Sequence, residues 1–126
     1  MKRVLVALDA SARAPTVLAA AARVAERASA SLVLFRAVDP PGQLAAAERD
    51  LARLASAVPR AHVETIRAAF AAAPEGICRA ARDLRADLIV LGSDSDGATT
   101  AQVLDQADRD VLVVRTGHAR CSDLPA

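Results

Sequence analysis

Residues 86–93 read Ala-Asp-Leu-Ile-Val-Leu-Gly-Ser, and this short stretch decides the fold class. Its centre, residues 88–91, is a run of large aliphatic side chains with no polar residue between them. A strand with one solvated face alternates polar and apolar residues, whereas a strand covered on both faces is apolar throughout. The stretch therefore predicts a strand that is buried inside a parallel sheet and ends at Gly92.

Similar apolar runs lie on both sides of this stretch. They are residues 4–8, 31–38 and 111–114, with a less regular run at 62–67 that indicates a strand nearer the sheet edge. Between them, aliphatic residues recur at helical spacing, over residues 17–28, 44–58, 74–84 and 100–107, with Ser11 as a candidate cap for the first helix. Strands that alternate with helices predict an α/β fold: a doubly wound parallel sheet of five strands, with helices on both faces and right-handed crossovers.

The composition limits the classes of function. The chain has 126 residues, which fits one domain, and a formal net charge of +1. Because basic charge is not in excess and Phe35 and Phe70 are the only aromatic residues, binding to nucleic acid or to an anionic membrane is not expected. Lys2 is the only lysine, which excludes a Schiff-base or phosphate-loop lysine within the domain. Cys78 and Cys121 match no zinc or redox spacing and no secretory signal is seen, so we expect a cytoplasmic location.

Two polar loops follow predicted strands. Residues 9–11 (Asp-Ala-Ser) follow the first strand, and residues 92–97 (Gly-Ser-Asp-Ser-Asp-Gly) follow the fourth. In a doubly wound sheet, ligands bind beyond the carboxyl ends of the strands, at the point where the strand order reverses. The two loops are therefore the candidate ligand site.

The same stretches resemble the universal stress protein family. Residues 4–11 look like the family's opening, in which an apolar strand runs into Asp-Gly-Ser, and residues 86–93 are very similar to its Ala-Asp-Leu-Ile-Val-Met-Gly-Ser. Residues 111–115 resemble its closing strand. The resemblance implies the strand order 3-2-1-4-5 and a universal stress protein domain over residues 1–115, and we expect residues 116–126 to form a loose C-terminal tail.

The resemblance also implies a nucleotide site. In ATP-binding members, the residue at the position of Asp9 contacts adenine, the position of Val38 gives main-chain contacts to the base, and the stretch matching Leu91–Gly92 approaches the ribose and phosphates. A later glycine, followed by Ser or Thr, binds phosphates at a helix start, where backbone N–H groups favour anions. The candidate nucleotide-binding residues are therefore Asp9, Val38, Leu91, Gly92 and Gly97.

The chain departs from the family pattern on the phosphate side. Ser95 stands where the family has a glycine, and Asp94 and Asp96 flank it. The Gly-Ser/Thr element is missing, because the segment between Gly97 and Val111 is several residues too short. Each nearby carboxylate disfavours a phosphate by about 1 kcal/mol or more in a partly wet cleft. We therefore expect no tightly bound cofactor, and at most weak binding of ATP or another adenine nucleotide.

Some of these residues allow two interpretations. Asp9 is either an adenine contact or a residue that caps the turn before the first helix. Asp94 and Asp96 either form a solvated acidic loop or bind Mg²⁺ together with Asp9. A calcium loop is rejected, because the closing Glu at its twelfth position is absent. Cys78 lies on the inward face of a predicted helix and is expected to be a buried small hydrophobe.

Other α/β families lack their required residues. A receiver domain needs an Asp after the third strand and a Lys after the fifth, and a flavodoxin needs a Ser/Thr-rich loop after the first strand; neither feature is present. A Gly-x-Ser-x-Gly elbow and a Walker motif are also missing. No enzymatic activity is therefore expected.

Two functions remain open from the sequence. The chain is either a stress-response regulatory module that acts as a dimer without tightly bound ATP, or an adenine-nucleotide-binding module that uses Asp9, Val38, Gly92 and Gly97. The predicted dimer contact is an edge strand of unbroken apolar character. An exposed strand of this kind can pair with other chains and aggregate, so we expect it to be covered. Family members commonly pair this strand with its twofold mate. The residues expected to form the homodimer contact are Val111, Leu112, Val113 and Val114.

Overall fold

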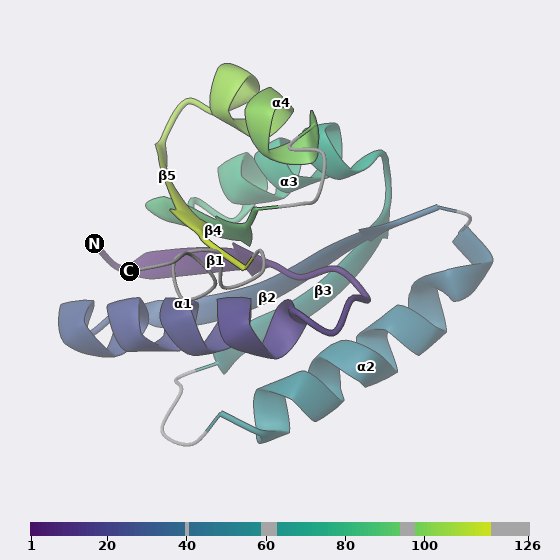
Figure 1. Ribbon diagram of the computed structural model, residues 1–126, viewed down its shortest axis with the longest axis horizontal. Helices are drawn as coiled ribbons and strands as arrows, with labels where there is room; N and C mark the ends of the chain where they lie inside the picture. Colours follow the sequence, from purple (N-terminus) through teal and green to yellow (C-terminus); the bar gives the residue numbers. More distant parts are fainter. Residues whose placement is uncertain (40, 59–62, 94–97, 117–126) are drawn as a thin grey trace, which may run out of the picture.

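The computed structural model describes residues 1–39, 41–58, 63–93 and 98–116 (Figure 1). In this part of the chain, strands and helices alternate from end to end. The elements are β1 (Arg3–Ala7), α1 (Ala14–Ala28), β2 (Ser31–Val38), a short 3-10 helix (Pro41–Gln43), α2 (Leu44–Ser56), β3 (Val63–Phe70), α3 (Ala73–Asp83), β4 (Leu88–Gly92), α4 (Ala98–Gln106) and β5 (Asp110–Val114).

The strands form one parallel five-stranded sheet in the order β3-β2-β1-β4-β5, which confirms the predicted fold class and strand order. β1 lies at the centre, where Val4 pairs with Leu32 of β2 and with Leu88 of β4. From β1 the chain proceeds to one edge through β2 and β3, and then returns to the other side of β1 through β4 and β5. The order therefore reverses between β1 and β4, and the loops that follow these two strands flank a crevice.

Both faces of the sheet are covered, which explains the uninterrupted apolar runs. On one face, Val4 and Val6 of β1 pack in a cluster with α1 and with Leu51 of α2. On the other face, Leu5 belongs to a cluster with Ile77 of α3 and Val103 of α4. Figure 1 shows these two helix layers on opposite sides of the sheet. Since successive side chains of a strand point to opposite faces, a strand between two helix layers must be apolar at every position.

Asp87, the acidic residue of the stretch 86–93, ties β4 to the start of β1. Its Oδ2 atom accepts hydrogen bonds from the backbone N–H groups of Lys2 (2.8 Å) and Arg3 (2.9 Å). These two donors hold the pKa of the Asp87 carboxyl below its usual range. The carboxylate therefore pins the amino ends of the two central strands, and the ligand site lies at their opposite ends.

The first helix begins later than expected, and Ser11 does not cap it. Helix α1 starts at Ala14 with Arg13 at the N-cap position, and Arg13 makes no side-chain capping hydrogen bond. Instead, the Ser11 hydroxyl accepts a hydrogen bond from the backbone N–H of Arg13 (3.2 Å) within the preceding turn. Ala12 and Arg13, the two residues between Ser11 and the first residue of α1, therefore belong to the turn, and Arg13 lines the cavity at this edge of the sheet.

Cys78 of α3 is 4% exposed, as expected for a small core residue. Burial raises the pKa of its thiol, so the sulfur stays protonated and packs as an apolar group. Cys121 and most of the predicted C-terminal tail lie outside the described residues.

Candidate functional site

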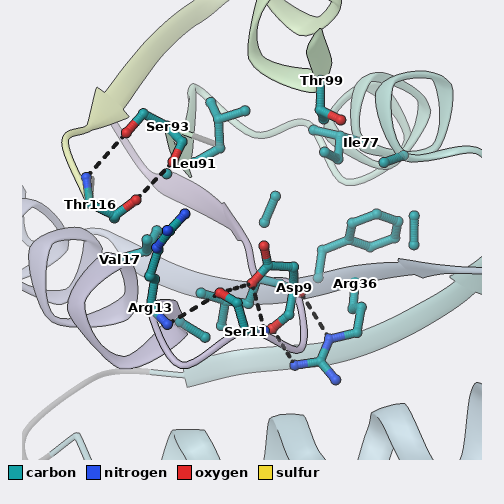
Figure 2. Close-up of a pocket in the computed structure, with 17 residues that line it drawn as sticks. Asp9, Ser11, Arg13, Val17, Arg36, Ile77, Leu91, Ser93, Thr99 and Thr116 are labelled. Atoms are coloured by element: carbon teal, nitrogen blue, oxygen red, sulfur yellow. Dashed lines mark hydrogen bonds between the residues drawn. The ribbon is translucent and has the colours of Figure 1, made fainter. Parts of the chain in front are cut away.

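A cavity of about 330 Å³ opens beyond the carboxyl ends of β1 and β4 (Figure 2). Its walls come from the β1–α1 turn, the start of α1, the end of β2, α3 and the start of the loop after β4. Phe35, Ile77 and Leu91 supply apolar surface, and polar groups are contributed by Asp9, Arg13 and Thr116 among others. An apolar pocket with a few convergent polar groups is the usual form of a small-molecule site.

Asp9 is both a turn residue and a cavity residue. Its Oδ1 atom accepts hydrogen bonds from the backbone N–H (3.0 Å) and the hydroxyl (2.6 Å) of Ser11, which closes the turn after β1. Figure 2 shows the second carboxylate oxygen of Asp9 pointing into the cavity. The turn function is therefore present in the fold, and one oxygen is still directed at the space where a ligand would lie.

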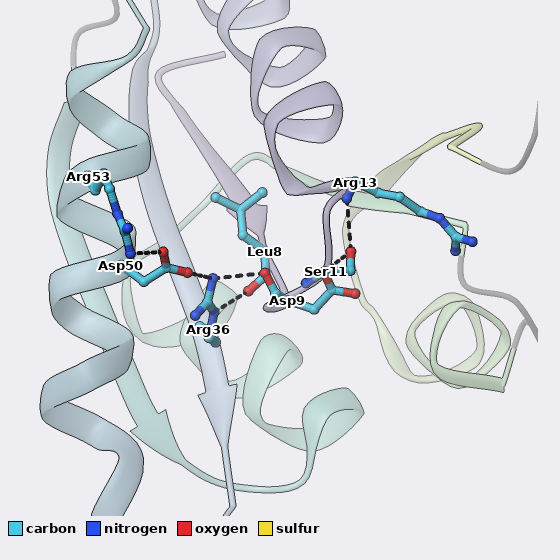
Figure 3. Close-up of polar contacts among 7 residues, drawn as sticks. All are labelled: Leu8, Asp9, Ser11, Arg13, Arg36, Asp50 and Arg53. Carbon is cyan, nitrogen blue, oxygen red and sulfur yellow. Dashed lines mark hydrogen bonds and ion pairs between the residues drawn. The ribbon is translucent and has the colours of Figure 1, made fainter.

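Arg36 of β2 anchors the turn that carries Asp9 (Figure 3). Its Nε donates a hydrogen bond to the carbonyl oxygen of Leu8 (2.9 Å), and its Nη2 donates to the carbonyl oxygen of Asp9 (2.8 Å). The same Nη2 forms an ion pair with Oδ2 of Asp50 in α2 (2.8 Å). Arg36 is 7% exposed, so these contacts compensate for the burial of its charge. One buried cation thus joins β2, the β1–α1 turn and α2.

Asp50 balances this buried charge. The hydrogen bond from Arg36 holds the pKa of the Asp50 carboxyl below its usual range, and Arg53 of the same helix adds to the effect through Oδ1 at 2.7 Å. The carboxylate is therefore ionised at neutral pH, and the ion pair with Arg36 is complete.

Arg36 was not among the predicted site residues. The available signal was a single arginine inside the otherwise apolar run 31–38, where a charge is expected to need a partner. Its main partners, two backbone carbonyls from another strand's turn, carry no side-chain signature in the sequence.

The β4 side of the cavity is closed by the segment that follows β5. The backbone N–H of Ser93 donates to the carbonyl of Val114 (2.9 Å), and the Thr116 hydroxyl donates to the carbonyl of Ser93 (2.8 Å). The backbone N–H of Thr116 in turn donates to the Ser93 hydroxyl (3.2 Å). Thr116, which was assigned to the loose tail, is therefore held against the loop after β4.

Gly92 lies under this contact. A Cβ atom at Gly92 would lie 2.7 Å from Cγ2 of Val17 and 3.1 Å from Cγ2 of Thr116, so the space beside its Cα is already filled by the chain. The glycine is thus required by the packing between β4, α1 and the segment after β5.

The predicted site residues fall into three groups. Asp9, Leu91 and Gly92 line the cavity. Val38 is buried at the end of β2 and does not line it, and its carbonyl oxygen accepts a hydrogen bond from the backbone N–H of Ala71 (3.2 Å). Gly97 lies outside the described residues. The nucleotide contacts assigned to all five therefore stay predictions.

The alternative metal site depends on residues that the structure does not describe. Asp94 and Asp96 lie in the segment 94–97. Among the described residues, no group of three or more His, Cys, Asp or Glu side chains is placed to hold a metal ion. In the same part of the chain, none of the helices is both long enough and apolar enough to cross a membrane.

Nearly the whole chain matches one protein family. A sequence model described as the universal stress protein family matches residues 1–115. The chain belongs to the universal stress protein family. No curated protein matches the chain.

Solved structures of universal stress proteins agree with this assignment. A universal stress protein crystallised in complex with cAMP is similar over 92% of this chain and 98% of its own, with a TM-score of 0.77 and 25% identity. UspA from Lactobacillus plantarum covers 90% of this chain and 97% of its own, with a TM-score of 0.74 and 25% identity. A family member from Burkholderia pseudomallei reaches 29% identity, with a TM-score of 0.72 over 90% of this chain and 95% of its own.

Proposed function

We propose that this universal stress protein is a non-enzymatic regulatory module whose cavity receives a small adenine nucleotide and does not bind ATP tightly. The observation that carries the proposal is the cavity itself, with one Asp9 oxygen directed into it. Its volume of about 330 Å³ is at the lower end of the range for small-molecule pockets, which suits a nucleoside or mononucleotide.

The walls of the cavity match the chemistry of adenine. A purine ring has two apolar faces and an exocyclic amino group that donates hydrogen bonds. The apolar surfaces of Phe35, Ile77 and Leu91 suit the faces, and the free oxygen of Asp9 suits the amino group. The similar universal stress protein that was crystallised with cAMP supports a ligand of this size and class.

The regulatory part of the proposal follows from what the cavity lacks. The described residues that line it include one carboxylate, Asp9, and neither a histidine nor a cysteine. General acid–base catalysis normally uses a proton donor and acceptor pair, and nucleophilic catalysis needs an activated nucleophile beside a base. The residues present suit reversible binding, so the bound state itself would be the signal.

Asparagine in place of Asp9 tests the binding proposal. An amide keeps an oxygen for the Ser11 turn, but replaces the free acceptor with a donor that faces the donating amino group of adenine. We expect adenosine and AMP to bind about tenfold more weakly to D9N, since a hydrogen bond to a charged group is worth about 1.5–3 kcal/mol when buried and less at an open site. Calorimetric titration measures the change.

Asp105→Asn is the matched control, because it removes one carboxylate from an exposed position on α4 and should leave the affinity unchanged. Wild-type protein that binds neither adenosine, AMP nor cAMP would contradict the proposed ligand class. An equal loss of affinity in D9N and D105N would contradict the contact with Asp9.

The module is further proposed to act as a homodimer through β5. This strand is an edge of the sheet, and Leu112 at its centre is 37% exposed. We expect sedimentation to find a dimer at high micromolar concentration, and Leu112→Glu to convert it to a monomer because charges would be buried at a self-complementary contact. Phe70→Glu is the control on the opposite edge, where Phe70 of β3 is 57% exposed. A wild-type monomer at that concentration would rule out the dimer.

A further inference from the structure

We infer that Arg13 is the anion-binding group of the cavity, and that the cavity therefore takes an adenine nucleotide with a single phosphate group. The inference rests on the proposed function, because it concerns the same cavity. It assigns the phosphate to the side chain of Arg13, at the start of α1.

Two backbone donors on the β4 side of the cavity, within the part of the chain that the structure describes, are already used by the protein. The N–H of Ser93 bonds to Val114, and the N–H of Thr116 bonds to the Ser93 hydroxyl. The space beside Gly92 is filled by Val17 and Thr116, so a phosphate cannot approach the backbone there as it does in an open glycine loop. An anion that took either of these two N–H groups would have to break a hydrogen bond within the fold.

Two cationic side chains line the cavity among the described residues, Arg13 and Arg36. Arg36 directs its guanidinium to the carbonyls of Leu8 and Asp9 and to the carboxylate of Asp50. Arg36 is thus committed to holding the fold together, and its charge is already balanced.

The guanidinium of Arg13, in contrast to that of Arg36, bonds to no described part of the fold and is balanced by no described carboxylate. The backbone N–H of Arg13 bonds to Ser11, but no described residue forms a hydrogen bond or an ion pair with its guanidinium. Figure 2 shows this guanidinium extending from the start of α1 toward Thr116, and Figure 3 shows it directed away from Asp9 and Arg36. A cation with available donors therefore lies on one side of the cavity, and the adenine-facing oxygen of Asp9 lies on the other.

One guanidinium suits one phosphate. Its planar donors can bind two oxygens of a single phosphate group in parallel, which is the favoured geometry for this pair. Further phosphates would find no additional uncommitted cation among the described lining residues, and they would add negative charge to a cavity that already holds Asp9. We therefore expect AMP to bind more tightly than adenosine, and ATP no more tightly than AMP.

Calorimetric titration of adenosine, AMP and ATP into wild-type protein, R13Q and R23Q tests this inference. The wild type is expected to prefer AMP over adenosine by about tenfold, and the preference should fall to about one in R13Q while the affinity for adenosine stays the same. Raising the salt concentration should weaken AMP binding and leave adenosine unaffected. Arg23, exposed on α1, is the charge-matched control, and R23Q should retain the wild-type preference.

Each outcome separates the inference from the proposed function. Adenosine binding with no gain for AMP, or an unchanged AMP preference in R13Q, overturns the role of Arg13 and leaves the adenine site standing. Loss of both ligands to the same extent in R13Q means that Arg13 supports the fold of the turn, and this also overturns the inference. Tighter binding of ATP than of AMP contradicts the single-phosphate assignment. If neither adenosine nor AMP binds wild-type protein, the proposed function fails and the inference fails with it.

Discussion

Methionine in place of Arg36 is expected to lower the free energy of unfolding by about 3 kcal/mol. The side chain is 7% exposed, and its guanidinium donates to two backbone carbonyls and pairs with Asp50. Hydrogen bonds to charged groups contribute about 1.5–3 kcal/mol each, and part of that sum is offset because the cost of burying the guanidinium disappears with it. The Leu8 and Asp9 carbonyls lose their donors in the variant.

Denaturant unfolding followed by far-ultraviolet circular dichroism measures this change, because the chain has no Trp or Tyr to report by fluorescence. R36K is the informative companion variant: lysine keeps the charge but lacks the planar fork, so we expect an intermediate loss of about 1–2 kcal/mol. Arg53, 77% exposed on α2, supplies the control, and R53Q should change the stability by less than about 1 kcal/mol. A change in the free energy of unfolding of less than about 1 kcal/mol in R36M as well would show that the contacts of Arg36 add nothing to the stability.

The ion pair between Arg36 and Asp50 also predicts how stability depends on pH. The pKa of the Asp50 carboxyl is lowered in the folded protein, whereas in the unfolded chain it is about 3.9. The stabilising contribution is therefore fully present above the unfolded value and is lost as the pH falls through the lower, folded value. Since D50N has no group to titrate, its stability should fall less steeply over this acidic window.

Replacing Phe35 with alanine is expected to cost about 3–5 kcal/mol, the usual range for deleting a buried phenylalanine side chain. Phe35 is 1% exposed in β2, and it packs in the cluster formed with α3 and α4. Helix α3 packs against the ring of Phe35 here, as the short distance at Gly76 shows: a Cβ atom added to this glycine would lie 3.7 Å from Cζ of Phe35. The structure has little freedom to collapse into the space left by the ring.

Chemical denaturation compares F35A with F35L, which keeps most of the apolar volume and should lose about 1–2 kcal/mol. Because Phe35 also lines the cavity, F35A should bind adenosine more weakly even at temperatures where it is fully folded. A cost for F35A below about 1 kcal/mol would mean that the α3 side of the sheet is loosely packed.

The arrangement of the sheet could be predicted because burial on both faces leaves a direct mark on the sequence. The run 88–91 has no polar position, and the central strand β1 has none between Val4 and Ala7. The run that forms β3 is less regular in sequence, and the structure places β3 at the sheet edge with Glu64, Arg67 and Phe70 exposed. Helix boundaries were less accurate: the turn hydrogen bonds of Ser11 compete with a capping bond and shift the start of α1 to Ala14.

The site could be predicted only where it follows strand ends. β4 ends with Leu91 and Gly92, and Asp9 follows the end of β1. A parallel sheet brings the carboxyl ends of β1 and β4 to the same edge, so these three residues line one cavity. Arg13 and Arg36 could not be assigned in this way. Whether an arginine side chain forms hydrogen bonds and ion pairs within the protein depends on the groups that surround it. These groups come from elements that are distant in sequence, such as α2 and the β1–α1 turn.

The sequence by itself thus determined the alternating order of elements, the parallel sheet, the family and the edge at which a ligand site lies, because periodicity and strand-end positions are local properties of the chain. Only the tertiary structure decided how the charges at that edge are used. It ties Arg36 to carbonyls and to Asp50, fills the space beside Gly92 with Val17 and Thr116, and leaves the Arg13 guanidinium with no bonding partner among the described residues. Pairing and close packing depend on three-dimensional distances between distant segments, and a linear pattern of residues does not contain those distances.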